Sequence, residues 1–170
     1  MKKLISALAF TIILMGGNAY GQKIGQVNFD EILVLLPEYD SFQVKLEKYR
    51  NKLGEELEYQ TNEIELQYKN LEREQSKAVP NKKTIEFIQM NIQNMGQTLE
   101  QNKLALQDSF TTRQKALFLP IQDKMKKAIE IVAKEKGYTQ VLDSSQLLYS
   151  READNLDEAV RKQLGIVKKP

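Results

Sequence analysis

Apolar residues recur every three or four positions through a long stretch of the chain, from Pro37 to Leu119. In the first half of the stretch, the stripe consists of Tyr39, Phe42, Leu46, Tyr49, Leu53, Leu57, Ile64, Tyr68 and Leu71, with Gln60 filling one place. The mean step is about 3.6 residues, which is the repeat of an α-helix. A stripe this narrow indicates a coiled-coil seam rather than one face of a globular core.

A second stripe of similar length follows a break at Val79-Pro80-Asn81. It consists of Ile85, Ile88, Ile92, Met95, Leu99, Leu106, Phe110 and Leu117, with Asn102 and Arg113 filling the gaps. Two long helices joined by a short connection are expected to lie antiparallel, which predicts a helical hairpin with its tip near residues 78–82. One continuous rod kinked at the proline is the alternative. Against it, Pro80 suits the first turn of a new helix, which Asn81 or Thr84 could cap.

The two helices are predicted to meet along a seam that draws residues from both stripes. Its members are Leu46, Tyr49, Leu53, Leu57, Ile64, Ile88, Ile92, Met95, Leu99 and Leu106. The positions outside the seam are rich in Glu, Gln, Lys and Asn, as expected for a shaft surrounded by water.

The segment before the hairpin is predicted to hold one strand and one short helix. Residues 23–29 alternate apolar and polar side chains and indicate a strand, with Ile24 and Val27 among its apolar members. Asp30 is expected to cap a short helix, and Pro37 is expected to end that helix or bend the chain into the hairpin.

Two more helical segments are expected after the hairpin. Pro120 should interrupt the second long helix, and a separate helical segment over residues 121–136 should end at Gly137. A last amphipathic helix should be capped by Asp157 and stopped by Gly165.

Two strand-like runs lie between these helices, over residues 138–142 and 147–150. They flank residues 143–146, which suggests a β-hairpin although the strongest turn dipeptides are lacking. Val141 and Leu148 are the apolar residues expected to pack inward from the two runs.

These elements predict an α+β fold that is mostly helical, with a small β-sheet body and a long antiparallel coiled-coil hairpin as an arm. The body comprises residues 22–37 and 120–170, and the arm comprises residues 38–119. Strands from both ends of the chain are expected to join one sheet. Because the arm takes about half of the mature chain, the body is small for a self-sufficient core, which favours an oligomer.

Residues 1–21 have the layout of a cleaved secretory signal. A short basic start precedes a mostly apolar run that is too short to span a membrane, and small residues occupy the two positions read by a signal peptidase. An uncleaved anchor is the alternative. The segment contains two lysines and no acids, so the mature chain has equal numbers of basic and acidic residues. Such a neutral chain lacks the positive field that non-specific nucleic-acid binding requires.

The residue types argue against an enzyme. The chain has no His and no Cys, so the usual groups for acid–base, nucleophilic and metal chemistry are missing, and no cofactor or metal site is expected. No glycine-rich phosphate loop follows a strand. Asp143 is the best isolated carboxylate, and a turn residue is its simpler interpretation.

Large apolar residues outside the seam suggest a surface that meets non-polar material. The candidates are Tyr59, Leu66, Phe87, Met90 and Leu104. Met and aromatic side chains suit a surface that adapts to many partners. Ordinary scatter of surface residues or packing between arms would explain them equally well.

The tip carries a slight excess of basic residues between positions 66 and 90. Such an excess would favour anionic clients or transient contact with a membrane surface. A solvated turn is the simpler explanation of the same residues.

The chain resembles the Skp/OmpH family of periplasmic chaperones over essentially the whole mature sequence. The segments that carry the resemblance are Lys23-Ile-Gly-Gln-Val-Asn28, Leu36-Pro-Glu-Tyr39, Lys136-Gly-Tyr-Thr-Gln-Val-Leu-Asp143, Leu148-Tyr149 and Asn155-Leu-Asp-Glu-Ala-Val160. No single segment is a strong motif, but their order around a coiled-coil insertion is specific.

The resemblance implies a homotrimer whose bodies join through their small sheets, with Ile24, Val27, Val141 and Leu148 in the joined core. Three arms would surround a cavity that holds unfolded outer-membrane β-barrel proteins without ATP. The neutral charge departs from the strongly basic members of the family. Electrostatic capture of clients and a lipopolysaccharide site are therefore not carried over. A structural or adaptor protein of the cell envelope, with one dedicated partner, is the alternative function.

Overall fold

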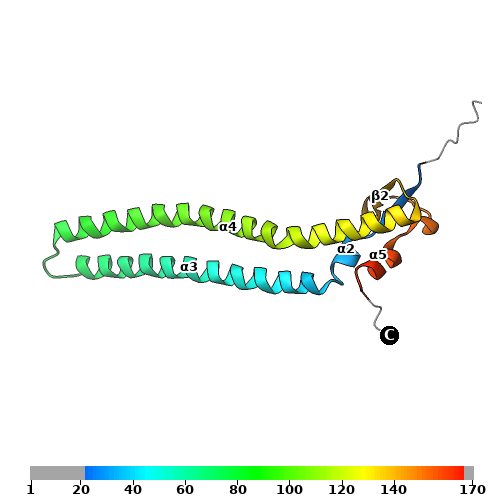
Figure 1. Cartoon of the computed structure of the whole chain (residues 1–170). Coiled ribbons are helices and arrows are strands. Elements are labelled where there is room, and N and C mark those ends of the chain that lie inside the picture. Colours follow the sequence, from blue (N-terminus) through cyan, green and yellow to red (C-terminus); the bar gives the residue numbers. More distant parts are fainter. Residues whose placement is uncertain (1–21, 167–170) are drawn as a thin grey trace, which may run out of the picture. The chain divides into compact units, whose positions relative to one another are not determined.

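The computed structural model describes residues 22–166 of the chain (Figure 1). The predicted signal peptide and the last residues, 167–170, lie outside the described part. The elements in chain order are β1 (Ile24–Val27), α2 (Phe29–Leu33), α3 (Pro37–Gln75), α4 (Lys82–Lys136), β2 (Gln140–Asp143) and α5 (Asp157–Gln163). Two short 3-10 helices, Ser144–Gln146 and Glu152–Asp154, lie between β2 and α5.

The chain divides into two compact units. The first, called the sheet unit below, comprises Met1–Phe29 and Ala128–Pro170, and its described residues are 22–29 and 128–166. The second, called the hairpin unit, is the continuous stretch Asp30–Lys127. Helix α4 contributes to both units. The division into body and arm at residues 37 and 119 stays a prediction.

The long helices of the hairpin unit pack against each other as an antiparallel pair (Figure 1). The rings of Phe42 and Phe118 lie 5.6 Å apart, and the side chains of Gln60 and Asn102 form a hydrogen bond of 3.1 Å. The two residue numbers in each pair average 80 or 81, so the same antiparallel register holds from Phe42 to Gln60 on α3. The predicted hairpin is confirmed, and the kinked rod is excluded.

The tip of the hairpin is a short connection between Gln75 and Lys82. The side chain of Asn81 accepts a hydrogen bond of 3.2 Å from the backbone N–H of Thr84, so Asn81 caps the second helix as one of the two predicted candidates. At the other end of the unit, Pro37 occupies the first turn of α3, where its missing N–H costs nothing.

Helix α4 continues through Pro120, so the predicted interruption at this residue is wrong. A proline within a helix removes one backbone hydrogen bond and costs about 3 kcal/mol. The burial of Ile121 and Met125 directly after the proline favours keeping the helix intact on both sides. The α4 ribbon bends where its colour passes from green to yellow, and proline is a common cause of a bend in a helix (Figure 1).

The two strands of the sheet unit pair in parallel, with Ile24 opposite Gln140 and Val27 opposite Asp143. Strands from both ends of the described chain therefore join one sheet, as predicted. On β1, a further parallel bridge joins Gln26 to Asn155. Parallel strands need a long crossover, and here the whole helical hairpin supplies it.

The predicted second strand over residues 147–150 is wrong, because the chain there is irregular. The carboxylate of Asp143 accepts a hydrogen bond of 3.0 Å from the N–H of Ser145 and starts a 3-10 turn. This turn directs the following residues away from β2, and Leu148 and Tyr149 are left exposed. The interpretation of Asp143 as a turn residue is confirmed.

Two predicted caps differ from the structure. Helix α2 begins at Phe29, so Asp30 lies inside its first turn. Helix α5 begins at Asp157, whose carboxylate accepts a hydrogen bond of 2.7 Å from the N–H of Asn28 instead of capping α5. The helix stops at Gly137 and Gly165 are confirmed, because both residues adopt a positive φ, 71° and 74°.

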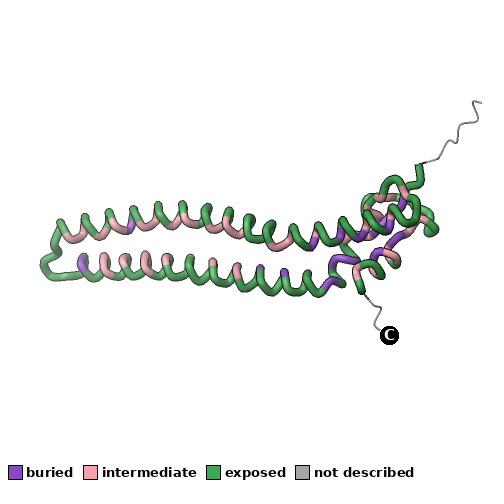
Figure 2. The backbone as a smooth tube through the Cα atoms, in the orientation of Figure 1, coloured by how far each residue is buried: buried purple, intermediate pink, exposed green. Residues whose placement is uncertain are grey.

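The buried cores of the two units are small. The sheet unit buries Val27, Ala128, Val132, Leu156 and Val160. The hairpin unit buries Ile32, Leu33, Leu36, Phe42, Leu46, Ile92, Ile121 and Met125. Figure 2 shows that the facing sides of α3 and α4 are mostly half-buried, because each helix of a pair covers only one stripe of the other.

Candidate functional site

The residues predicted to form the seam are buried or half-buried in the hairpin unit. Leu46 and Ile92 are buried, and the other predicted seam residues are half-buried. Tyr68, which the sequence pattern places in the stripe, is instead 55% exposed. The covered positions nearby are Gln67, Asn70 and Leu71, because the contact stripe drifts around a straight helix as it approaches the tip.

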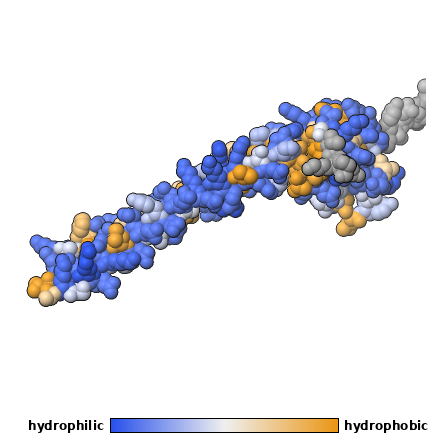
Figure 3. Space-filling model, turned by 90° about the horizontal axis from the view of Figure 1, so that it is seen from below, coloured by the Kyte–Doolittle hydropathy of each residue, from blue (hydrophilic) through white to orange (hydrophobic). Residues whose placement is uncertain are grey.

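The candidate client-contact residues are all exposed in the single chain. The exposed fractions are 64% for Tyr59, 50% for Leu66, 57% for Phe87, 53% for Met90 and 68% for Leu104. On the face drawn in Figure 3, a few separate orange groups interrupt the blue surface of the hairpin.

These residues are spread along both helices. Tyr59 and Leu66 are seven positions apart on α3, which puts them on one side of that helix about 10 Å from each other. Phe87 and Met90 are three positions apart on α4 and are neighbours on its surface. Leu104 lies about 20 Å along α4 from Met90. The hairpin thus offers exposed apolar side chains at several levels along its length.

The candidate trimer residues of the sheet unit differ in exposure. Val27 is buried and Val141 is half-buried, whereas Ile24 is 41% exposed and Leu148 is fully exposed. Among the described residues, β2 has β1 as its one strand neighbour. A single copy therefore leaves a sheet edge and nearby apolar side chains uncovered.

Glu74, Lys77 and Asn81 form a small hydrogen-bonded cluster at the hairpin tip, called the clasp below, which is not evident from the sequence. Glu74 is buried, one carboxylate oxygen accepts a hydrogen bond of 2.5 Å from the ammonium of Lys77, and the other accepts one of 3.3 Å from the N–H of Asn81. The only sequence signal is an acid three residues before a base at the end of a helix. The clasp holds the loop while Val79 at its apex is 85% exposed.

The clasp is expected to loosen in acid. The hydrogen bond from Lys77 lowers the pKa of Glu74, and the N–H of Asn81 lowers it further. A carboxyl group whose pKa is lower in the folded chain stabilises the fold above its unfolded pKa and loses this effect as the pH falls through its folded pKa. Amide exchange at Asn81, corrected for intrinsic rates, should therefore accelerate below about pH 4, and Glu74→Gln should abolish that acceleration. Unchanged protection of Asn81 down to about pH 2 would contradict this.

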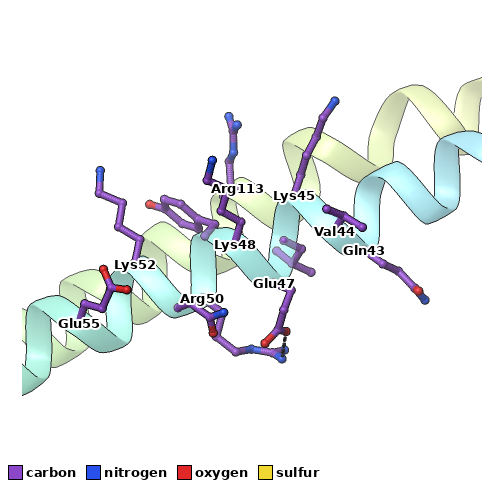
Figure 4. Close-up of a pocket in the computed structure, with 12 residues that line it drawn as sticks. Gln43, Val44, Lys45, Glu47, Lys48, Arg50, Lys52, Glu55 and Arg113 are labelled. Carbon is purple, nitrogen blue, oxygen red and sulfur yellow. Dashed lines mark hydrogen bonds and ion pairs between the residues drawn. The ribbon is translucent and has the colours of Figure 1, made fainter.

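A shallow groove follows α3 from Gln43 to Glu55 and reaches Arg113 of α4 (Figure 4). Leu46 and Tyr49 contribute apolar lining, and the Arg113 guanidinium lies 6.0 Å from the Tyr49 ring. In Figure 4 four basic residues point to the same side: Lys45, Lys48, Lys52 and Arg113.

The opposite side of the groove carries an exposed ion pair between Glu47 and Arg50, 2.7 Å long. The groove therefore combines basic and apolar groups, which suits contact with a polypeptide surface. Its side chains do not converge on a point where a nucleophile and a base could act together.

The described residues contain no group of three or more carboxylates, histidines or cysteines that could hold a metal ion. Within residues 22–166, none of the helices combines the length and the apolar character needed to cross a membrane.

Comparisons with known proteins identify the family of this chain. A family model described as outer membrane protein (OmpH-like) matches residues 23–164. The chaperone protein Skp of Photorhabdus luminescens is 25% identical over 166 residues, which cover 96% of this chain and 99% of the relative. The chaperone protein Skp of Vibrio cholerae serotype O1 is 25% identical over 174 residues, with the same coverage.

The fold is also shared with a solved structure. The crystal structure of an OmpH-like protein from Caulobacter crescentus CB15 matches with a TM-score of 0.70 over 87% of both chains, at 12% identity. The family match covers most of the chain, and the relatives match it almost from end to end. The chain therefore belongs to the OmpH/Skp family of chaperones, which are not enzymes.

Proposed function

We propose that the chain is an ATP-independent holdase of the periplasm. In this proposal three copies assemble, and their hairpins enclose a space that shields unfolded outer-membrane β-barrel proteins. The observation that carries the proposal is the long hairpin with separate exposed apolar residues, in a member of a chaperone family. An unfolded barrel protein presents apolar segments that aggregate in water, and many weak contacts would shield them without selecting one sequence.

The exposed apolar side chains of the sheet unit support self-association. Ile24 and Leu142 are each 41% exposed on the two strands, and Leu148 and Tyr149 are exposed after them. The unpaired edge of β2 is a template for a further strand, and residues 147–150 have a strand-like sequence without a strand partner among the described residues. Pairing between the edge of one copy and this segment of the next is a head-to-tail contact, which forms a closed ring of three when the rotation between successive copies is a third of a turn.

The periplasmic location rests on the signal-like residues 1–21 and on the family. Because the mature chain has equal numbers of basic and acidic residues, we attribute most of the free energy of client binding to apolar contacts. Transient contact of the tip with a membrane surface would use Val79 together with the nearby lysines, Lys77, Lys82 and Lys83.

Suppression of aggregation tests this function. A urea-unfolded β-barrel protein is diluted into buffer with the mature chain, and light scattering is followed with and without ATP. The proposal expects full suppression at one trimer per client and no effect of ATP. Scattering that persists at several-fold excess of trimer would rule out the holdase. Capture of a single stoichiometric partner from an envelope extract, with no binding of unfolded barrel proteins, would favour an adaptor.

A further inference from the structure

Both apolar stripes of the hairpin are interrupted at the same level by an amide side chain. Gln60 fills a seam place between Leu57 and Ile64 on α3, and Asn102 fills one between Leu99 and Leu106 on α4. Both amides are half-buried, and the Nδ2 group of Asn102 donates a hydrogen bond of 3.1 Å to Oε1 of Gln60.

Glu56 determines which end of the Gln60 amide faces Asn102. The Nε2 group of Gln60 donates a hydrogen bond of 2.8 Å to the carboxylate of Glu56, one turn earlier on α3. A carboxylate only accepts hydrogen bonds, so the NH2 end of Gln60 must face Glu56, and its carbonyl oxygen must face α4. Asn102 therefore has to present its own NH2 group, as it does.

We propose that Glu56, Gln60 and Asn102 form a polar lock that fixes the register of α3 against α4. A polar residue at one seam position of a coiled coil specifies the register, because a shifted pairing leaves its polar groups facing apolar neighbours. If α4 were shifted along α3 by one helical turn, the Gln60 amide would lie at the level of Leu99 or Leu106.

The apolar seam of this hairpin discriminates poorly between registers without such a lock. Most of the seam is only half-buried, so apolar packing alone discriminates weakly between one pairing and another. A partner helix shifted by one turn, or an apolar segment of a bound polypeptide, presents side chains that would pack equally well in the seam. The lock therefore adds specificity that the apolar stripes do not provide, and it acts whether or not a client is bound.

The first test probes the direction of these side-chain hydrogen bonds. It compares the melting temperatures of variants of the full-length protein. Asn102→Asp places a second acceptor at the far end of Gln60, so the Gln60 amide cannot satisfy both neighbours, and the melting temperature should fall by several degrees. Adding Glu56→Gln lets the Gln60 amide turn over and satisfy both, so at least half of the loss should be recovered. Glu56→Gln alone should have little effect. Absence of recovery in the double variant would overturn the orienting role of Glu56.

The second test measures the register of α3 against α4 by the distance between two spin labels. The chain contains no cysteine, so Asn62→Cys and Gln114→Cys allow spin labels at two exposed positions, one on each helix. With labelled chains diluted among unlabelled ones, the parent should give one narrow distance. Gln60→Leu with Asn102→Leu should keep or raise the melting temperature. It should also add a second distance displaced by about 5 Å, which is one helical turn.

A matched control separates the lock from a general rise in hydrophobicity. Asn51→Leu with Gln107→Leu adds the same apolar groups at exposed positions of the same helices and should leave the single distance unchanged. A single unchanged distance in the variant with leucine at both lock positions would show that the amide pair is only a tolerated polar contact, and would overturn the proposal.

Discussion

Replacing Tyr59, Leu66, Phe87 and Met90 by serine is expected to weaken the binding of an unfolded β-barrel protein by at least about tenfold. All four side chains are at least half exposed, so the change removes contact surface without opening the seam. Each lost contact contributes on the order of 1 kcal/mol when the side chain is covered by a client, and tenfold in affinity corresponds to about 1.4 kcal/mol. Binding would be measured with a fluorescent client kept unfolded in dilute urea.

The control removes an apolar side chain elsewhere on the hairpin. Leu119 is also more than half exposed and lies outside the groove of Figure 4, and its replacement by serine should change client affinity by less than about twofold. Native mass should be the same for the parent and both variants. Equal affinities for the parent and the fourfold variant, with the assembly intact, would show that the client contacts lie elsewhere.

The second large effect is expected at Gly25 in the sheet unit. A Cβ atom at this position would lie 2.8 Å from Cδ1 of Leu156 and 3.1 Å from Cδ1 of Tyr138. Leu156 is buried, so the clash cannot be relieved by moving its side chain into solvent. Gly25→Val should therefore destabilise the sheet unit by about 1–3 kcal/mol or more, the usual cost of overpacking, and should weaken assembly.

Gly54 offers the matched control on the exposed side of α3, because a Cβ atom added there would meet nothing within 4 Å outside the backbone of its own helix. Gly54→Val should leave the unfolding midpoint nearly unchanged, since valine is no worse than glycine in a helix. Unfolding in urea, followed by circular dichroism, compares the two variants. A Gly25→Val protein as stable and as fully assembled as the Gly54→Val protein would show that the packing around β1 is looser than the structure indicates.

The hairpin could be predicted from the sequence because its causes are local and repeated. Two stripes with a helical step and a break containing Pro80 determine the helices and their antiparallel order. The joining of strands from both ends of the chain in one sheet could also be predicted from their patterns. The exposure of the candidate client residues is consistent with their positions outside the stripes, while their role stays a prediction.

The elements that differ from the sequence-based expectation have three separate physical causes. Pro120 is a strong helix breaker, yet α4 continues through it between buried residues. Residues 147–150 have a strand-like pattern, but the Asp143 turn leaves them without a strand partner in the described part of the chain. Tyr68 falls outside the seam because small deviations from a fixed step accumulate along a long helix.

The polar groups of the hairpin are the hardest to predict. Glu74 resembles the many solvated carboxylates of α3 until its contact with Asn81, seven residues later, is known. Gln60 and Asn102 are visible in the sequence only as gaps in the stripes. Their hydrogen bond depends on the register between the helices, which neither stripe determines by itself.

The mass of the native particle tests the central claim most directly. We expect the mature chain to exist as three copies at micromolar concentration, and as three copies plus one client after an unfolded β-barrel protein is added. A stable single copy that stays single in the presence of that client would contradict this claim.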